Sequence, residues 1–233
     1  MRIVHKIGLE AEFILLDDKG KMRFPAKHGF SHDEFFLLGE FRADPGSTRE
    51  ETIGYYMKAL AQVLYLAKEK KLTADFSGVW SITPEMKADI LRKMSSKTVP
   101  ECKNIYGIDI LKFSDDVVEG GTIKECRISA GLHVHFSRWI EHEWTDKDGR
   151  KQTAWKSILT PSQMKKIITS MDSEALQKYT LGVPLKYRQK GFYEIKPYGF
   201  EYRSLPMVPA YTYLENVMSL VDLAFCQLEN LDK

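Results

Sequence analysis

Three short segments of the chain each place two charged or metal-binding side chains two positions apart. They are Glu10 and Glu12 in GLEAEF, His133 and His135 in GLHVHFS, and Glu201 and Arg203 in FEYRSLP. Each segment is rich in apolar or β-branched residues, which is typical of a strand, and residues two apart in a strand point to the same face, about 6.6 Å apart. If the three strands lie in one sheet, a single face carries carboxylates, imidazoles and a guanidinium.

Such a face is unfavourable unless cations are present. Two carboxylates about 7 Å apart repel each other by roughly 2.4 kcal/mol at an effective dielectric constant near 20. Divalent cations remove this repulsion, and carboxylate oxygens and imidazoles are suitable ligands for them. The pattern therefore favours a site for a divalent metal and a phosphate-bearing ligand. Taken singly, each pair is also compatible with the exposed face of a half-buried strand, and this alternative stays open.

Further candidate residues lie outside these three pairs. Glu40, in GEFRADPG, would add a carboxylate from a fourth strand, and Asp44 follows it at a turn. Arg188, in KYRQKG, stands before the last pair of predicted strands and could reach a phosphate, although a cationic hairpin surface explains it equally well.

The elements that must position these residues can be predicted from alternation, turn residues and caps. Residues 3–16 alternate as a strand, turn at 17–20 and return near 21–24, and residues 35–42 form another strand. Ser47 and Glu50 resemble a capping box that begins a helix. The apolar face of this helix is expected to contain Ile53, Tyr56, Met57, Leu60, Val63, Leu64 and Ala67.

The rest of the chain mixes strands and helices without a regular βαβ rhythm. Strands are predicted at 73–82, 117–136 with a turn at Gly120-Gly121, 185–195 and 198–205; helices are predicted from Pro84 to 94, from Pro161 to 177 and after Pro209. This order predicts an α+β fold, with a largely antiparallel sheet and helices on its outer face.

Length and composition limit the organisation and the class of protein. The 233 residues, 43% of them hydrophobic, predict a single domain spanning 1–233. A formal charge of +2 gives no field that favours nucleic acid, and no apolar run approaches the length of a membrane span. The first residues fit no secretory signal. Three cysteines without CxxC spacing predict a reducing, cytoplasmic environment.

The order of the motifs carries a resemblance to a known family. Glu10-x-Glu12, a strand with Glu40, Gly-x-His133-x-His135-x-Ser137, and Glu201-x-Arg203 before a long terminal helix occur in this order. The chain thereby resembles the catalytic domain of the glutamine synthetase and carboxylate-amine ligase superfamily, most of all the compact phage-type ligases. The resemblance spans about residues 7 to 225 and implies a glutamine synthetase-like fold.

The resemblance also implies roles for individual residues. Glu10, His133 and Glu201 would hold one Mg²⁺ or Mn²⁺ ion, and Glu12 and Glu40 would hold a second. His135 and Ser137 would lie near the ATP phosphates. Arg203 and Arg188 would neutralise the transferred phosphoryl group.

The implied activity is ATP-dependent joining of a carboxylate to an amine through an acyl phosphate, with small-molecule or peptide substrates. Three alternatives stay open: a phosphotransferase that acts on a nitrogen or guanidino group, a metal-dependent hydrolase that needs no ATP, and an inactive nucleotide-binding module. A homo-oligomer is also left open, whereas nucleic-acid and membrane partners are not expected.

Overall fold

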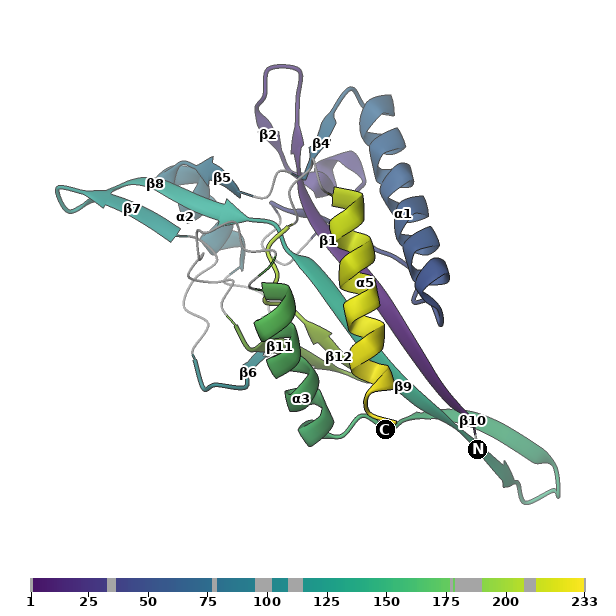
Figure 1. Ribbon diagram of the computed structural model, residues 1–233. Helices are drawn as coiled ribbons and strands as arrows, with labels where there is room; N and C mark the ends of the chain where they lie inside the picture. Colours follow the sequence, from purple (N-terminus) through teal and green to yellow (C-terminus); the bar gives the residue numbers. More distant parts are fainter. Residues whose placement is uncertain are drawn as a thin grey trace.

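The computed structural model describes residues 2–32, 37–76, 79–94, 102–108, 115–176, 178, 190–207 and 213–232. Within this part of the chain it has an α+β fold with a large antiparallel sheet, a smaller sheet and several helices (Figure 1). The predicted fold class is confirmed at this level.

The main sheet is built around two long strands, β1 (Ile3–Leu16) and β9 (Leu132–Thr145). Its order is β2-β1-β9-β12-β11-β6, while β3 and β4 also pair with β1 and β10 pairs with β9. The other strands are β2 (Met22–Arg23), β3 (Gly39–Arg42), β4 (Thr73–Asp75), β6 (Lys103–Asn104), β10 (Lys151–Ser157), β11 (Phe192–Lys196) and β12 (Gly199–Tyr202). Each pairing in this sheet is antiparallel.

A second sheet has the order β5-β8-β7, with β5 (Val79–Ile82), β7 (Asp115–Glu119) and β8 (Thr122–Ser129). The single strand predicted at 73–82 is therefore wrong, because β4 pairs with β1 and β5 pairs with β8. Alternation does not identify the neighbour of each half. The predicted turn at Gly120 and Gly121 is confirmed, since both have positive φ angles and connect β7 to β8.

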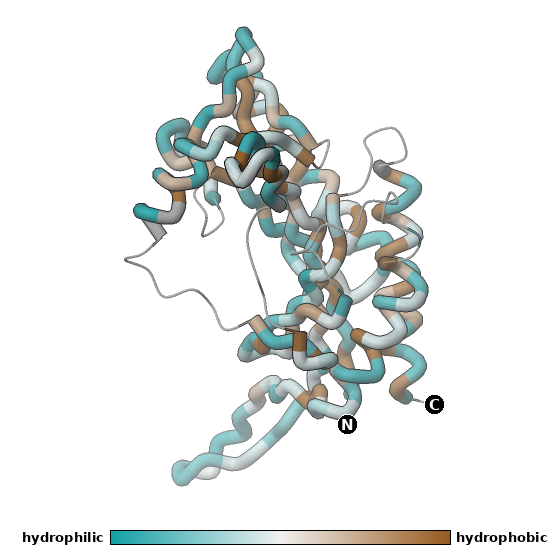
Figure 2. The backbone as a smooth tube through the Cα atoms, turned by 90° about the vertical axis from the view of Figure 1, so that its left-hand side faces the viewer, coloured by the Kyte–Doolittle hydropathy of each residue, from teal (hydrophilic) through white to brown (hydrophobic). Residues whose placement is uncertain are grey.

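Three helices cover one face of the main sheet, namely α1 (Arg49–Glu69), α3 (Pro161–Met171) and α5 (Tyr213–Glu229). Figure 1 shows α5 in front of β1 and β9, with α3 on one side of it and α1 on the other. The sheet contributes buried apolar residues to this layer, among them Leu9, Val134, Phe136 and Phe200. Figure 2 shows hydrophobic residues inside the body and a hydrophilic β9–β10 hairpin extending from it.

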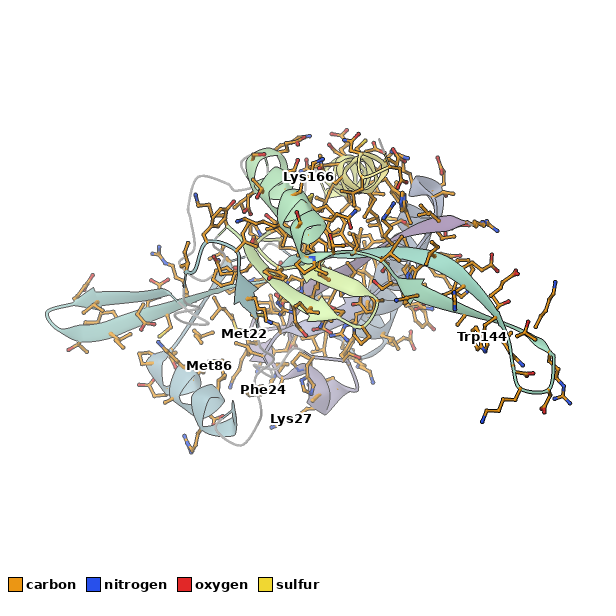
Figure 3. All side chains as sticks on the ribbon, turned by 90° about the horizontal axis from the view of Figure 1, so that it is seen from below. Met22, Phe24, Lys27, Met86, Trp144 and Lys166 are labelled. Carbon is orange, nitrogen blue, oxygen red and sulfur yellow. The ribbon has the colours of Figure 1, made fainter. Side chains whose placement is uncertain are left out.

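The remaining helical segments are α2 (Pro84–Met94), a 3-10 turn η1 (Pro25–His28) and a π-helical turn η2 (Asp172–Leu176), which continues α3. Seen from below in Figure 3, α3, with Lys166, lies above the main sheet, and α2, with Met86, lies below it. Residues 33–36, 185–189 and 208–212, which contain parts of predicted elements, lie outside the described residues.

Two details predicted for helix α1, its N-cap and the width of its buried face, differ in the structure. Its N-cap is Thr48, whose side chain accepts a hydrogen bond from the Glu51 backbone, so the capping pair is one residue later than Ser47 and Glu50. Both registers offer a hydroxyl followed three residues later by Glu, which is why local sequence does not separate them. Met57 and Leu64 are 37% and 47% exposed, so the buried face is narrower than expected.

Candidate metal site on the central sheet

Antiparallel pairing of three strands brings the predicted residues side by side. Glu10 of β1 lies opposite His133 of β9, and Glu201 of β12 lies opposite His135. Directly opposite residues project to the same face, which here is the face away from α1, α3 and α5. Glu10, His133 and Glu201 are fully buried, and Glu12 is 2% exposed. The alternative of an exposed polar strand face is therefore wrong for these four side chains.

Strand β3 adds Glu40 and a cation on the same face. Glu12 lies opposite Glu40, and Glu10 lies opposite Arg42. The side chain of Glu40 is 12% exposed, whereas Asp44 is exposed in the turn after β3. The fourth carboxylate of the site is thus Glu40, and Asp44 does not join the buried cluster.

His133 lies among three carboxylates. Its Nδ1 atom is 2.9 Å from Glu10 Oε1 and 2.9 Å from Glu201 Oε1, and its Nε2 atom is 3.7 Å from Glu12 Oε1. Burial and the charge of Arg203 oppose protonation, but the attraction of the three carboxylates is stronger and raises the pKa of His133 to about 9. In the metal-free protein this imidazole holds a proton at neutral pH and partly neutralises the cluster.

The carboxylates themselves are shifted in opposite directions. Burial opposes ionisation of Glu10 and Glu201, yet their hydrogen bonds with His133 hold both pKa values well below the usual range. For Glu40, burial and then the charge of Glu10 raise the pKa to about 8. At neutral pH the site therefore contains ionised carboxylates, Glu10 and Glu201, next to Glu40, which is mostly protonated.

Three cationic side chains also neutralise the cluster. They are Arg42 beside Glu10 and Glu40, and Arg203 and Lys196 beside Glu194 and Glu201. Arg42 Nε lies 2.5 Å from Glu10 Oε2, and Arg203 Nη1 lies 2.5 Å from Glu201 Oε1. Lys196 Nζ lies 3.0 Å from Glu201 Oε2. A buried acidic face beside cations can bind divalent metal and polyphosphate together.

One group of atoms is suitable for coordinating a metal ion. Ligand atoms of Glu10, His135 and Glu201 all lie within 4.8 Å of one another. His135 Nε2 and Glu201 Oε2 are buried without a hydrogen-bond partner among the described residues, although Lys196 forms the ion pair noted above. Two carboxylates with one imidazole suit Mg²⁺ or Mn²⁺ better than Zn²⁺. These residues fit the metal that the resemblance implies, and His135 Nε2 lies 3.3 Å from Glu10 Oε2.

A pocket of about 670 Å³ adjoins the cluster along β1 and β9. It is lined by the cations Arg2, Lys6 and Arg42, the aromatic residues Trp139, Trp155 and Tyr198, and the polar residues His135 and Ser137, among others. His135 belongs both to the pocket and to the group of possible metal ligands. The pocket is therefore aromatic and cationic, and two of its lining residues, Arg42 and His135, contact the buried carboxylate of Glu10.

One predicted residue, Ser137, lies apart from the cluster: it is 5% exposed and lines the pocket. Predicted Arg188 lies outside the described residues. Sequence reasoning missed Glu194, Lys196 and Tyr198. The alternation in FYEIK, which places Glu194 and Lys196 on one face of β11, was the signal for the first two. Tyr198 lies in a turn, where no alternation points to it.

Comparison with known proteins found no match among protein-family models, curated proteins or solved structures. Among the described residues, no helix combines the length and apolar character that crossing a membrane requires.

Proposed function

We propose that the protein is an ATP-dependent ligase that joins a carboxylate to an amine through an acyl phosphate, on a fold of the glutamine synthetase type. The observation that carries the proposal is the group formed by Glu10, His135 and Glu201, whose ligand atoms lie within 4.8 Å of one another at the edge of the pocket. A metal group beside a pocket with several cations suits a metal-bound polyphosphate better than a neutral ligand.

The ligand set has room for more than one divalent ion. Glu10 and Glu201 with an imidazole would hold one ion, and Glu12 with Glu40 would hold the second. The raised pKa of Glu40 supports this role, because a nearby cation would ionise it. Bound Mg²⁺ or Mn²⁺ would supply charge neutralisation on the phosphate oxygens.

The pocket supports a nucleotide as the phosphate carrier. Trp139 and Trp155 offer aromatic surface on which a base can stack, and Lys6 and Arg42 supply positive charge between them and the carboxylates. A volume of about 670 Å³ lies within the range of small-molecule and cofactor sites. The phosphates would then extend towards His135 and the metal ligands.

The cations beside Glu201 would stabilise the transferred phosphoryl group. Arg203 and Lys196 lie at the end of the cluster where β11 and β12 meet. The acceptor carboxylate attacks the γ-phosphorus and ADP leaves, which gives an acyl phosphate; the amine then attacks the acyl carbon, phosphate leaves and the amine nitrogen loses a proton. Protein residues position the reactants and neutralise charge, so no Ser or Cys nucleophile is needed.

Product analysis tests the proposal. The protein is incubated with ATP, Mg²⁺ and pooled carboxylic acids and amines, and ADP, free phosphate and product mass are followed together. A ligase releases ADP and phosphate only when both an acid and an amine are present, beyond slow hydrolysis of the acyl phosphate. ADP with a phosphorylated amine and no free phosphate would replace the ligase by a phosphotransferase. Activity without ATP, or ATP binding without turnover, would contradict both.

A matched pair of variants links any activity to the site. Glu201→Gln removes a buried carboxylate of the cluster, whereas Glu143→Gln removes an exposed carboxylate from the same sheet, on β9. Turnover should be lost in the first variant and retained in the second. Equal activity in both would contradict the assignment of the site.

A further inference from the structure

One side of helix α1 carries apolar residues that the fold leaves exposed. Met57 and Leu64 belong to the face that the sequence pattern predicts to be buried, yet both are exposed, and Tyr65 beside them is 63% exposed. Figure 1 shows α1 at the outer edge of the helical layer, beyond α5. Apolar side chains that gather on the exposed side of a helix indicate a contact surface for another molecule.

Small residues alternate with the large ones along this side. Gly54 and Ala61 are also exposed, and Met57 and Leu64 follow them three positions later. This spacing of three and four places all four on one stripe of the helix, which we call the α1 seam. A Cβ atom at Gly54 would meet no atom within 4 Å among the described residues. Packing within the chain therefore does not require this glycine, although glycine weakens a helix relative to alanine.

The α1 seam is complementary to itself when a second α1 lies antiparallel to it, with the two-fold axis level with Ala59. Leu64 of one copy then lies opposite Gly54 of the other. Met57 lies opposite Ala61 in the same way, and the symmetry repeats each contact. Every large side chain thus meets a small one, which allows the helix axes to approach to about 8 Å.

The charges at the two ends of α1 favour the same arrangement. Glu50 lies in the first turn and Lys68 in the last turn, both are exposed, and both lie on the stripe of the seam. In the antiparallel register Glu50 of each copy lies opposite Lys68 of the other, which gives two ion pairs. A parallel pair would place like charges together, so the charges select the antiparallel direction.

We propose that two copies of this chain associate through the α1 seam as an antiparallel helix pair with two-fold symmetry. The metal site lies on the face of the main sheet away from α1, so the pairing leaves the pocket of each copy open. The inference does not depend on the proposed function, because neither metal nor nucleotide takes part in the contact.

The first test measures the mass of the full chain in solution over a range of concentrations, by sedimentation and light scattering. The wild type should pass from monomer to dimer. Leu64→Arg should raise the Kd of the dimer at least about a hundredfold, because the charge enters the seam twice in each dimer. Leu66→Arg is the matched control, since Leu66 is exposed about 200° around the helix from Leu64, and it should dimerise like the wild type.

The second test exchanges the charges. Glu50→Lys and Lys68→Glu should each raise the Kd about fivefold, because each places two pairs of like charges opposite one another. The double variant restores both ion pairs and should bind like the wild type. A double variant as weak as the single variants would overturn the antiparallel register.

The third test uses Gly54→Gln, which fills the space that Leu64 of the second copy would occupy. It should weaken dimerisation without lowering the melting temperature of the monomer, because glutamine is the better helix former. A wild type that stays monomeric at every concentration up to about 1 mM would overturn the inference. A monomer that instead sediments with anionic lipid vesicles, and ceases to do so in Leu64→Arg, would assign the seam to a membrane surface and would also overturn it.

Discussion

Replacing Glu201 by Gln changes the charge of the site with little change in shape. Glu201 is fully buried; its Oε1 atom lies 2.9 Å from His133 Nδ1 and 2.5 Å from Arg203 Nη1, and its Oε2 atom lies 3.0 Å from Lys196 Nζ. The amide leaves these cationic groups without their shared carboxylate. Breaking a buried ion pair by removing one partner costs about 3–5 kcal/mol, so the metal-free variant should lose stability of this order.

The same substitution should weaken metal binding. For the wild-type protein, Mn²⁺ at a hundred times its Kd should increase the free energy of unfolding by about 2.7 kcal/mol. If the loss of one carboxylate ligand weakens binding about tenfold, the same Mn²⁺ concentration should add only about 1.4 kcal/mol to the variant. Urea unfolding with and without Mn²⁺ gives both increments, and calorimetric titration gives the two affinities independently.

Glu143→Gln controls for the loss of an acidic residue, because Glu143 is exposed on β9. This control should keep the wild-type stability and the full Mn²⁺ increment. An equal Mn²⁺ increment in Glu201→Gln and wild type would refute the metal site. If the metal-free Glu201→Gln protein is as stable as the wild type, the reasoning that the ion pairs of Glu201 offset the cost of burying its charge is refuted.

Three other perturbations test separate parts of the structure. The pKa of His133 is raised from 6.5 to about 9, so the contribution of its proton to the free energy of unfolding is complete below pH 6.5 and is lost as the pH rises through 9. The pKa of Glu40 is raised from 4.5 to about 8, so its contribution is complete below pH 4.5 and is lost as the pH rises through 8. His133 contributes about 3 kcal/mol in this way, and urea unfolding between pH 6 and 10 should show a smaller loss in His133→Asn; an unchanged profile would contradict the shift. Gly199→Ala should lower the free energy of unfolding by at least about 2 kcal/mol, because the new Cβ would overlap the carbonyl oxygen of Phe136 in β9. In the control Gly54→Ala, in α1, the new Cβ meets no other atom and should raise the stability slightly. Similar shifts of the melting temperature in both variants would exclude the tight packing of the turn that precedes Gly199 against β9. Thr48→Ala should lower the free energy of unfolding by about 1 kcal/mol in urea, and no effect would mean that Thr48 is not the N-cap of α1.

The amino-acid sequence by itself determined the local features of the site. A period of two places Glu10 with Glu12, and His133 with His135, on common faces of their strands. The strand at 3–16 forms as predicted, whereas the region predicted as strand at 117–136 is divided among β7, β8 and β9, and β9 continues to Thr145. Pro161 located the start of α3, and in the structure Thr160 caps this helix in a capping box with Gln163. These features depend on residues a few positions apart, so the sequence contains the information that fixes them.

Only the tertiary structure decided how the pairs combine. The register that sets Glu201 opposite His135 joins strands more than sixty residues apart, and alternation within one strand carries no information about it. The burial of a carboxylate and the position of its counterion also depend on several strands at once. The desolvation of Glu10 and its contact with Arg42 require every strand around them to be in place. Tyr198 enters the site for the same reason, since a tight turn against a distant strand, rather than any local pattern, brings its hydroxyl to His135.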